Sequence, residues 1–339
     1  MSSDEPQSQD QTKVPPTCEI VDVTLRDGLQ NEASAMETLS RVELAHRLVQ
    51  AGVRRAEVTS FVSPRAVPQM ADAEELCGYL RSEVPELTLI GLVVNSRGVE
   101  RAARAGIDTV NFVVVATDTF SQRNQGEPTA DTLRRLPEMV AAARDHGMTT
   151  SVTIGAAFGC PFEGEVSESR LTDVVARAAD SGPHEIALAD TIGVAVPADI
   201  RARFEMCRQV VAPDVRWRGH FHNTRNTGIA NAIAAEASGV NVLDASLGGI
   251  GGCPFAPAAT GNIAMEDLVY ALERSGIETG ISLDDLMGSA WWLADRLGHD
   301  ISGLLAKAGP FPRAPSVISR QNIHEREKSE QRKEKSHVQ

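Results

Sequence analysis

The chain has 339 residues, of which 42% are hydrophobic and 23% are charged, and its formal net charge is −13. This composition is typical of a folded protein with room for one large domain or two ordinary ones. The acidic balance argues against nucleic acid as the main partner, because binding to phosphates needs a basic surface.

The N-terminal segment 1–17 is polar and rich in Ser, Gln, Asp and Pro, which predicts a disordered tail. It has neither the apolar core of a signal peptide nor the Arg-rich pattern of a transit peptide. No apolar run in the chain reaches the roughly 18 residues that a membrane-spanning helix needs. Five scattered cysteines without a CxxC pair indicate reduced thiols. We therefore expect a cytoplasmic protein with no membrane partner.

Eight short apolar runs follow this tail, and most of them lack alternation. Such runs are typical of β-strands that are covered on both faces. The predicted strands are 19–25, 55–60, 88–94, 109–115, 149–154, 185–189, 215–221 and 240–245.

Helical patterns lie between these runs, most clearly at 39–51, 130–143, 171–179 and 227–237. A glycine follows several helical runs just before the next strand, where a glycine that ends a helix belongs. These glycines are Gly52, Gly106, Gly147, Gly182 and Gly239.

Eight strand–helix units within about 280 residues predict an α/β fold, a closed (β/α)8 TIM barrel with its catalytic residues at the C-terminal face. We place this domain at 18–308 and expect a polar tail at 309–339. A doubly wound open sheet is the alternative, but no GxGxxG motif follows the first strand, which weakens a dinucleotide-binding interpretation.

The segment around His220 and His222 predicts a metal site. Residues at i and i+2 of a strand point to the same face, and these two end the predicted seventh strand. Barrel closure would bring them close to Asp27, which ends the first strand, and Asn262, which follows the eighth. Two nitrogen and two oxygen ligands suit Mg²⁺ or Mn²⁺, with Zn²⁺ as a further option. The alternative for each histidine alone is a hydrogen-bonded core residue.

Other polar residues lie at predicted strand ends. Arg26 would stabilise a developing oxyanion such as an enolate, or form an ordinary ion pair with a carboxylate. Glu57 lies within the second strand, where a charge is costly unless it is paired, so it would pair with Arg26 or orient a metal ligand. Asp190 ends the sixth strand and would order Arg26, transfer a proton or cap the next helix. Cys253 lies in the glycine-rich segment 247–255, where it would exchange a proton with substrate or be an incidental residue of a flexible or phosphate-binding loop.

These motifs, in this order, resemble the hydroxymethylglutaryl-CoA lyases, within the wider group of metal-dependent lyases and synthases on TIM barrels. The similarity runs from Glu19 to Leu305. It rests on the segments 26–32, 59–64, 159–164, 190–193, 220–222, 251–254 and 261–262.

The resemblance implies roles for particular residues. The divalent metal would be held by Asp27, His220, His222 and Asn262. Arg26 would stabilise the enolate and, with Gln30, contact the substrate. Cys253 would be the catalytic thiol, and Glu57 and Asp190 would be supporting catalytic acids.

The implied reaction is a metal-dependent retro-Claisen cleavage. Its substrate would be 3-hydroxy-3-methylglutaryl-CoA or a related 3-hydroxyacyl-CoA such as citramalyl-CoA, and its products acetyl-CoA and a keto acid. An acyl-CoA partner and a homodimer are expected on the same basis.

The first alternative is a Claisen-type synthase that condenses acetyl-CoA with a 2-keto acid. Such synthases usually carry Glu-Arg in the loop after the eighth strand, where this chain has Gly252-Cys253-Pro254. The second alternative is a non-enzymatic barrel, which the complete set of candidate ligands disfavours.

Two departures from the lyase pattern follow the histidine pair. Asn223 stands where the lyases commonly have Asp, and the segment 225–227 reads Arg-Asn-Thr where they usually have Tyr-Gly-Gln. We expect both changes to lie near the substrate pocket, so they leave the acyl group open between the candidates above.

Overall fold

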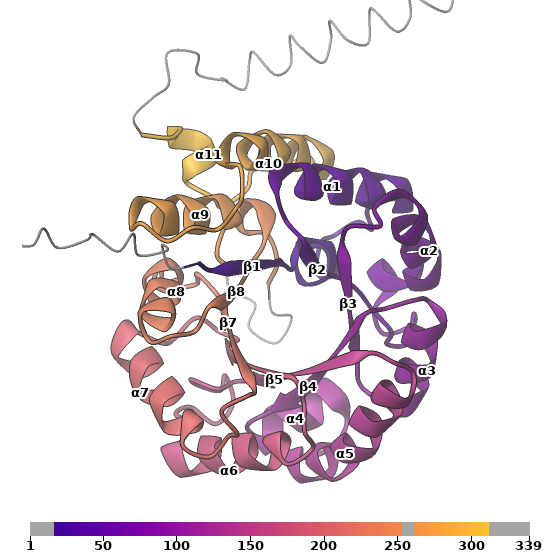
Figure 1. Ribbon diagram of the computed structural model, residues 1–339, viewed down its shortest axis with the longest axis vertical. Coiled ribbons are helices and arrows are strands. Elements are labelled where there is room, and N and C mark those ends of the chain that lie inside the picture. Colours follow the sequence, from indigo (N-terminus) through magenta and orange to yellow (C-terminus); the bar gives the residue numbers. More distant parts are fainter. Residues whose placement is uncertain (1–16, 253–260, 312–339) are drawn as a thin grey trace, which may run out of the picture.

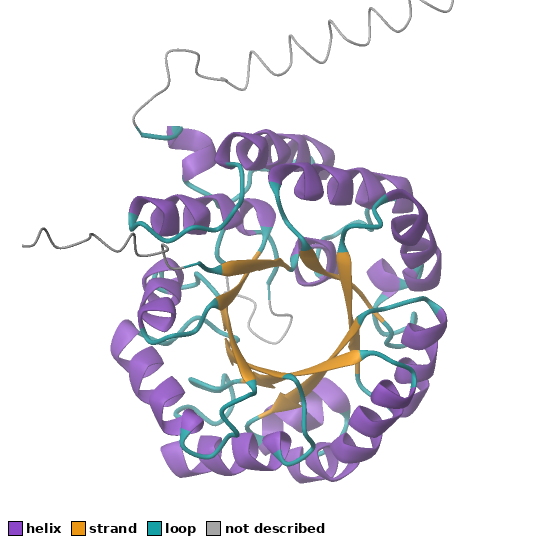
Figure 2. Ribbon diagram, in the orientation of Figure 1, coloured by secondary structure: helices purple, strands orange, loops and turns teal. Residues whose placement is uncertain are grey.

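The protein is described by a computed structural model that covers residues 17–252 and 261–311. Eight parallel strands form a closed barrel in chain order, and β8 pairs with β1 (Figures 1 and 2). The strands are β1 (Glu19–Asp22), β2 (Arg55–Ser60), β3 (Thr88–Val93), β4 (Thr109–Val115), β5 (Thr149–Gly155), β6 (Glu185–Asp190), β7 (Arg216–Phe221) and β8 (Val242–Ala245). The predicted TIM barrel is confirmed, and the open sheet is wrong.

Helices surround the barrel, as Figure 2 shows in purple. They are α1 (Thr38–Ala51), α2 (Ala73–Glu83), α3 (Ser96–Arg104), α4 (Asp118–Gln125), α5 (Thr129–Asp145), α6 (Glu168–Ala179), α7 (Pro197–Arg208), α8 (Gly228–Ala237), α9 (Met265–Arg274), α10 (Leu283–Leu297) and α11 (Leu305–Ala308). Each long helix turns one apolar face inward. In α5, for example, Leu133, Leu136, Met139, Val140 and Ala143 are buried at the three- and four-residue spacing of such a face.

The predicted helix-ending glycines all adopt a positive φ. Gly52 shows why glycine is needed there: its φ is +111°, and an added Cβ would lie 2.4 Å from the carbonyl oxygen of Gly280. A side chain at this position would meet both backbone strain and a collision. These turns set where each chain segment re-enters the barrel.

The first strand is shorter than predicted, which matters for the site. It ends at Asp22, because the Asp22 carboxylate accepts hydrogen bonds from the backbone N–H (3.1 Å) and the hydroxyl of Thr24 and so turns the chain out of the sheet. Residues Thr24–Gly28 then form one wide helical turn, in which the Gly28 N–H bonds the Val23 carbonyl five residues back at 2.9 Å. Arg26 and Asp27 therefore lie in a turn and not at a strand end.

The cysteines in the described residues are free and buried: Cys18, Cys77, Cys160 and Cys207. Burial raises the pKa of Cys18, Cys77 and Cys207 to about 12, so these thiols stay protonated. Cys253 lies outside the described residues.

Among residues 17–252 and 261–311, no helix combines the length and the apolar character that crossing a membrane requires.

Candidate metal centre and active site

Three of the predicted metal ligands converge at the C-terminal face of the barrel. The Nε2 atoms of His220 and His222 lie 3.1 Å apart. Asp27 Oδ2 lies 3.7 Å from His222 Nε2 and 4.0 Å from His220 Nε2. An octahedral ion with bonds of about 2.1 Å places neighbouring ligands about 3 Å apart, so the three atoms surround a space of the right size for a divalent cation.

His220 is oriented by an aspartate on the neighbouring strand. Its Nδ1 lies 3.0 Å from Asp244 Oδ2. Because an ionised carboxylate only accepts, Nδ1 carries the proton and the Nε2 lone pair faces the metal position. Burial opposes the charged form of the imidazole, but the Asp244 carboxylate outweighs it and raises the pKa of His220. The arrangement is the carboxylate–histidine pair that commonly supports a metal ligand.

Asn262 reaches the same group of atoms through its amide nitrogen. Nδ2 donates to Asp27 Oδ2 at 2.8 Å and to the Ile250 carbonyl at 3.2 Å. Ligation of a metal would need Oδ1 in its place, which a half-turn of the amide provides because its two ends have nearly the same shape. Ligation by Asn262 stays a prediction.

Arg26 is held between two carboxylates. Its Nε donates to Glu57 Oε2 at 2.6 Å, its Nη2 contacts the same oxygen, and its Nη1 donates to Asp27 Oδ1 at 2.5 Å. The predicted pairing of Glu57 with Arg26 is confirmed. Among the described residues, these contacts use three of the five N–H donors of the guanidinium, so two remain for a ligand.

The charges around Arg26 favour a bound cation. Burial alone would raise the pKa of Asp27, but Arg26 and the two histidines hold that pKa well below its usual range. Asp27 is therefore ionised, and this partly exposed carboxylate lies with the buried carboxylate of Glu57 around one guanidinium. A divalent metal beside Asp27 would compensate the excess negative charge.

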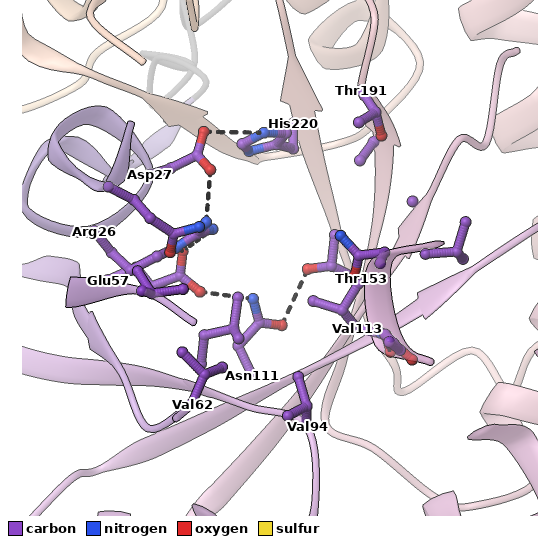
Figure 3. A pocket seen from close by; sticks show the side chains of 18 of the residues that line it. Arg26, Asp27, Glu57, Val62, Val94, Asn111, Val113, Thr153, Thr191 and His220 are labelled. Carbon is purple, nitrogen blue, oxygen red and sulfur yellow. Dashed lines mark hydrogen bonds and ion pairs between the residues drawn. The ribbon is translucent and has the colours of Figure 1, made fainter. Parts of the chain in front are cut away.

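A cavity of about 550 Å³ opens onto these residues. Arg26, Asp27, Gln30 and His220 line it. Figure 3 shows Val62, Val94 and Val113 on the side opposite Asp27 and His220. Leu92, Val115 and Phe120 also line the cavity. The cavity therefore has a polar side, which carries the candidate metal ligands, and a side with several valines.

Asp190 holds a loop rather than Arg26. Its carboxylate oxygens accept from the backbone N–H groups of Val194 at 2.9 Å and Ala195 at 3.0 Å, and burial raises its pKa. Among the described residues it forms no hydrogen bond or ion pair with Arg26, and it precedes the loop before α7 rather than capping that helix. Its catalytic role stays a prediction.

Asn223 and Arg225, where the sequence differs from the lyase pattern, hold loops beside the cavity. Asn223 Oδ1 accepts from the Gly228 N–H (3.1 Å) at the start of α8. Arg225 Nη1 donates to the carbonyls of Ile192 (3.0 Å) and Gly193 (2.9 Å). Neither side chain lines the described cavity, so any effect on the acyl group would pass through the loops that they hold.

Cys253 cannot be placed, since it lies outside the described residues. Its neighbour Gly252 lines the cavity, and the Gly252 carbonyl accepts from Asn31 Nδ2 at 2.6 Å.

The sequence analysis did not single out Asp244, although an acid within the apolar run of the eighth strand has the same unusual placement as Glu57. It also missed Asn111 and Arg218, which lie inside the barrel.

We predict that replacing His222 with alanine weakens metal binding. Removing one of three converging ligands should lower the affinity for Mn²⁺ at least tenfold, as measured by electron paramagnetic resonance of free Mn²⁺ during titration. His46→Ala, at an exposed histidine of α1 that pairs with Glu83 and does not line the cavity, is the control. Unchanged Mn²⁺ affinity in His222→Ala would refute the proposed centre.

Gly251→Ala should also weaken metal binding. Gly251 has φ +115°, and an added Cβ would lie 2.6 Å from Asn262 Nδ2 and 3.2 Å from the Asp27 carbonyl oxygen. Gly276→Ala is a matched control, because Gly276 has φ +81° but nothing within 4 Å of an added Cβ. Both variants should lose about 1–2 kcal/mol of unfolding free energy in urea, but only Gly251→Ala should lose Mn²⁺ affinity. Equal Mn²⁺ affinity in the two variants would contradict this.

Comparisons with known proteins agree with the geometry. The HMGL-like family model matches residues 17–290. The (R)-citramalyl-CoA lyase of Chloroflexus aurantiacus is 46% identical over 88% of this chain and 96% of its own length. The mitochondrial hydroxymethylglutaryl-CoA lyase of Macaca fascicularis is 35% identical over 87% of this chain and 90% of its own. A solved HMG-CoA lyase from Acinetobacter baumannii, in complex with coenzyme A and 3-methylmalate, superposes with a TM-score of 0.83 at 37% identity, covering 89% of this chain and 98% of that one. The chain belongs to the HMGL-like family.

Proposed function

We propose that the chain is a carbon–carbon lyase that cleaves a 3-hydroxyacyl-CoA, such as citramalyl-CoA or 3-hydroxy-3-methylglutaryl-CoA, to acetyl-CoA and a keto acid. One observation carries this proposal: the ligand atoms of Asp27, His220 and His222 meet in the same cavity as the guanidinium of Arg26. The names of the lyases that the chain resembles support the same reaction.

Asp27, His220, His222 and the predicted ligand Asn262 would hold the metal. The mixed nitrogen and oxygen donors favour Mg²⁺ or Mn²⁺, with Zn²⁺ as an alternative. When bound, the metal supplies a Lewis acid that makes a coordinated hydroxyl more acidic.

The cleavage needs a proton acceptor, an oxyanion partner and a proton donor. The 3-hydroxyl loses its proton, the bond between C2 and C3 breaks, and C3 becomes the carbonyl carbon of the keto acid. The electron pair passes to the thioester as the enolate of acetyl-CoA. The two free donors of Arg26 would bind the enolate oxygen, where negative charge develops. C2 then takes a proton, and we propose Cys253 as its donor.

The substrate's acyl group would lie between the two sides of the cavity. Its hydroxyl and carboxylate oxygens belong on the polar side, where Gln30 adds a neutral donor and acceptor near Arg26. Its alkyl branch belongs against the valines on the opposite side. This side therefore favours a branch without charge.

Further parts of the proposal rest on the sequence. The domain limits 18 and 308 fit the described elements, which run from Glu19 to Ala308. A homodimer and a cytoplasmic location are also proposed. Light scattering after size exclusion would test the dimer.

The first test is a substrate panel with Mg²⁺ or Mn²⁺. Purified protein should release acetyl-CoA from citramalyl-CoA, 3-hydroxy-3-methylglutaryl-CoA or a longer-branched analogue. Arg26→Lys should lower kcat by about 10²–10³-fold, because one ammonium cannot replace two aimed guanidinium donors. Cleavage of none of the substrates would reject the lyase. Condensation of acetyl-CoA with a 2-keto acid, without cleavage, would favour the synthase.

A second test concerns the thiol. Cys253→Ser should lower kcat by about 10²-fold or more, in the range of a lost general acid, while the affinity for Mn²⁺ is unchanged. Cys207→Ala, at a buried cysteine of α7, is the control and should retain activity. Full activity in Cys253→Ser would remove the proposed role of this residue.

A further inference from the structure

Asn111 lies in β4 at the floor of the cavity and is 2% exposed. Its Nδ2 donates to Glu57 Oε1 at 2.8 Å. Its Oδ1 lies 3.0 Å from each of two hydroxyls of β5, those of Ser151 and Thr153. Figure 3 shows this chain of contacts running from Thr153 through Asn111 and Glu57 to Arg26.

The direction of these hydrogen bonds is set at both ends. Arg218 can only donate, and its Nη2 lies 3.3 Å from Thr153 Oγ1, so the Thr153 hydroxyl accepts there and donates its own hydrogen to Asn111 Oδ1. Glu57 can only accept, so the amide nitrogen of Asn111 must face it. The amide orientation is therefore determined by its neighbours.

Each carboxylate oxygen of Glu57 therefore has a hydrogen-bond donor. Oε1 accepts from Asn111, and Oε2 accepts from Arg26. Without the amide, the buried Oε1 would have no partner among the described residues, and the carboxylate would gain by rotating toward other donors. Arg26 would then lose the fixed acceptor that aims its guanidinium into the cavity.

We propose that Asn111 is a positioning residue: it holds Glu57, and through Glu57 it aims Arg26 at the developing oxyanion. The inference rests on the proposed lyase function. Among the described residues, the Asn111 side chain hydrogen-bonds to Glu57, Ser151 and Thr153 and to none of the candidate metal ligands, so it is not itself part of the metal centre. A displacement of about 1 Å in a catalytic group costs as much as 10²-fold in rate.

Asn111→Leu keeps the size of the side chain and removes both hydrogen-bonding ends. We expect kcat to fall 10- to 100-fold, with Mn²⁺ affinity unchanged. Asn231→Leu is a matched control: Asn231 is a fully buried asparagine of α8 whose Nδ2 donates to the Ala195 carbonyl, away from Arg26. It should lower stability as Asn111→Leu does, with kcat retained. Full kcat in Asn111→Leu would overturn the proposal, and a change in KM alone would mean that Asn111 contacts substrate directly.

A double substitution tests whether Asn111 acts through Glu57. Glu57→Gln and Asn111→Asp together exchange the amide and the carboxylate. The exchanged pair still meets every partner, since the new carboxylate accepts from both hydroxyls and the new amide still offers Arg26 an oxygen. Each single substitution mismatches the pair, so the double variant should have a higher kcat than either single variant. A kcat equal to the product of the two single losses would show independent sites and overturn the inference.

A crystal structure of Asn111→Leu supplies a result that does not depend on activity. Displacement of Glu57 and Arg26 from their observed contacts would support the positioning role even if the wild-type chain cleaved none of the offered substrates. Inactive wild type would reject the proposed function, whereas unmoved Arg26 in this variant would reject the inference alone.

Discussion

Pairing of β8 with β1 is the constraint on which the site depends. Backbone partners run from Glu19 with Val242 to Asp22 with Ala245, and the Val23 N–H continues the ladder to the Ala245 carbonyl at 3.0 Å. This pairing closes the barrel and brings together residues more than 200 positions apart. Asp27 and Asn262 are within hydrogen-bonding distance only because of it. An open sheet would leave the metal ligands on separate edges.

Buried charge is the second physical theme of this barrel. Arg55 binds Glu185 through two hydrogen bonds, of 3.0 and 2.9 Å, and Arg218 lies 3.1 Å from the same carboxylate. Arg218 also lies 3.5 Å from Asp244. Burial would raise the pKa of Asp244, but Arg218 and His220 lower it, so it remains the anion that orients His220. Such charges are costly to bury alone, and pairing makes them tolerable.

The two halves of the site meet through these paired groups. Thr153 accepts from Arg218 and donates to Asn111, and Asn111 donates to Glu57. The side chains of Arg26 and His220 are therefore supported by one continuous set of polar contacts inside the barrel. A rigid support of this kind keeps catalytic groups aimed without reorganisation during the reaction.

The sequence alone determined the barrel, the order of its strands and the candidate ligand pair His220 and His222, because strand and helix periods and the i, i+2 rule are local properties of the chain. Only the tertiary structure decided how Arg26 and Asp27, adjacent in sequence, both face one cavity: Asp22 binds Thr24 and turns the chain out of β1. It also decided the partners of Asn111, whose hydrogen bonds from β4 reach two other strands, β2 and β5. Such contacts are long-range, and their energy depends on burial and on neighbours that no local pattern encodes.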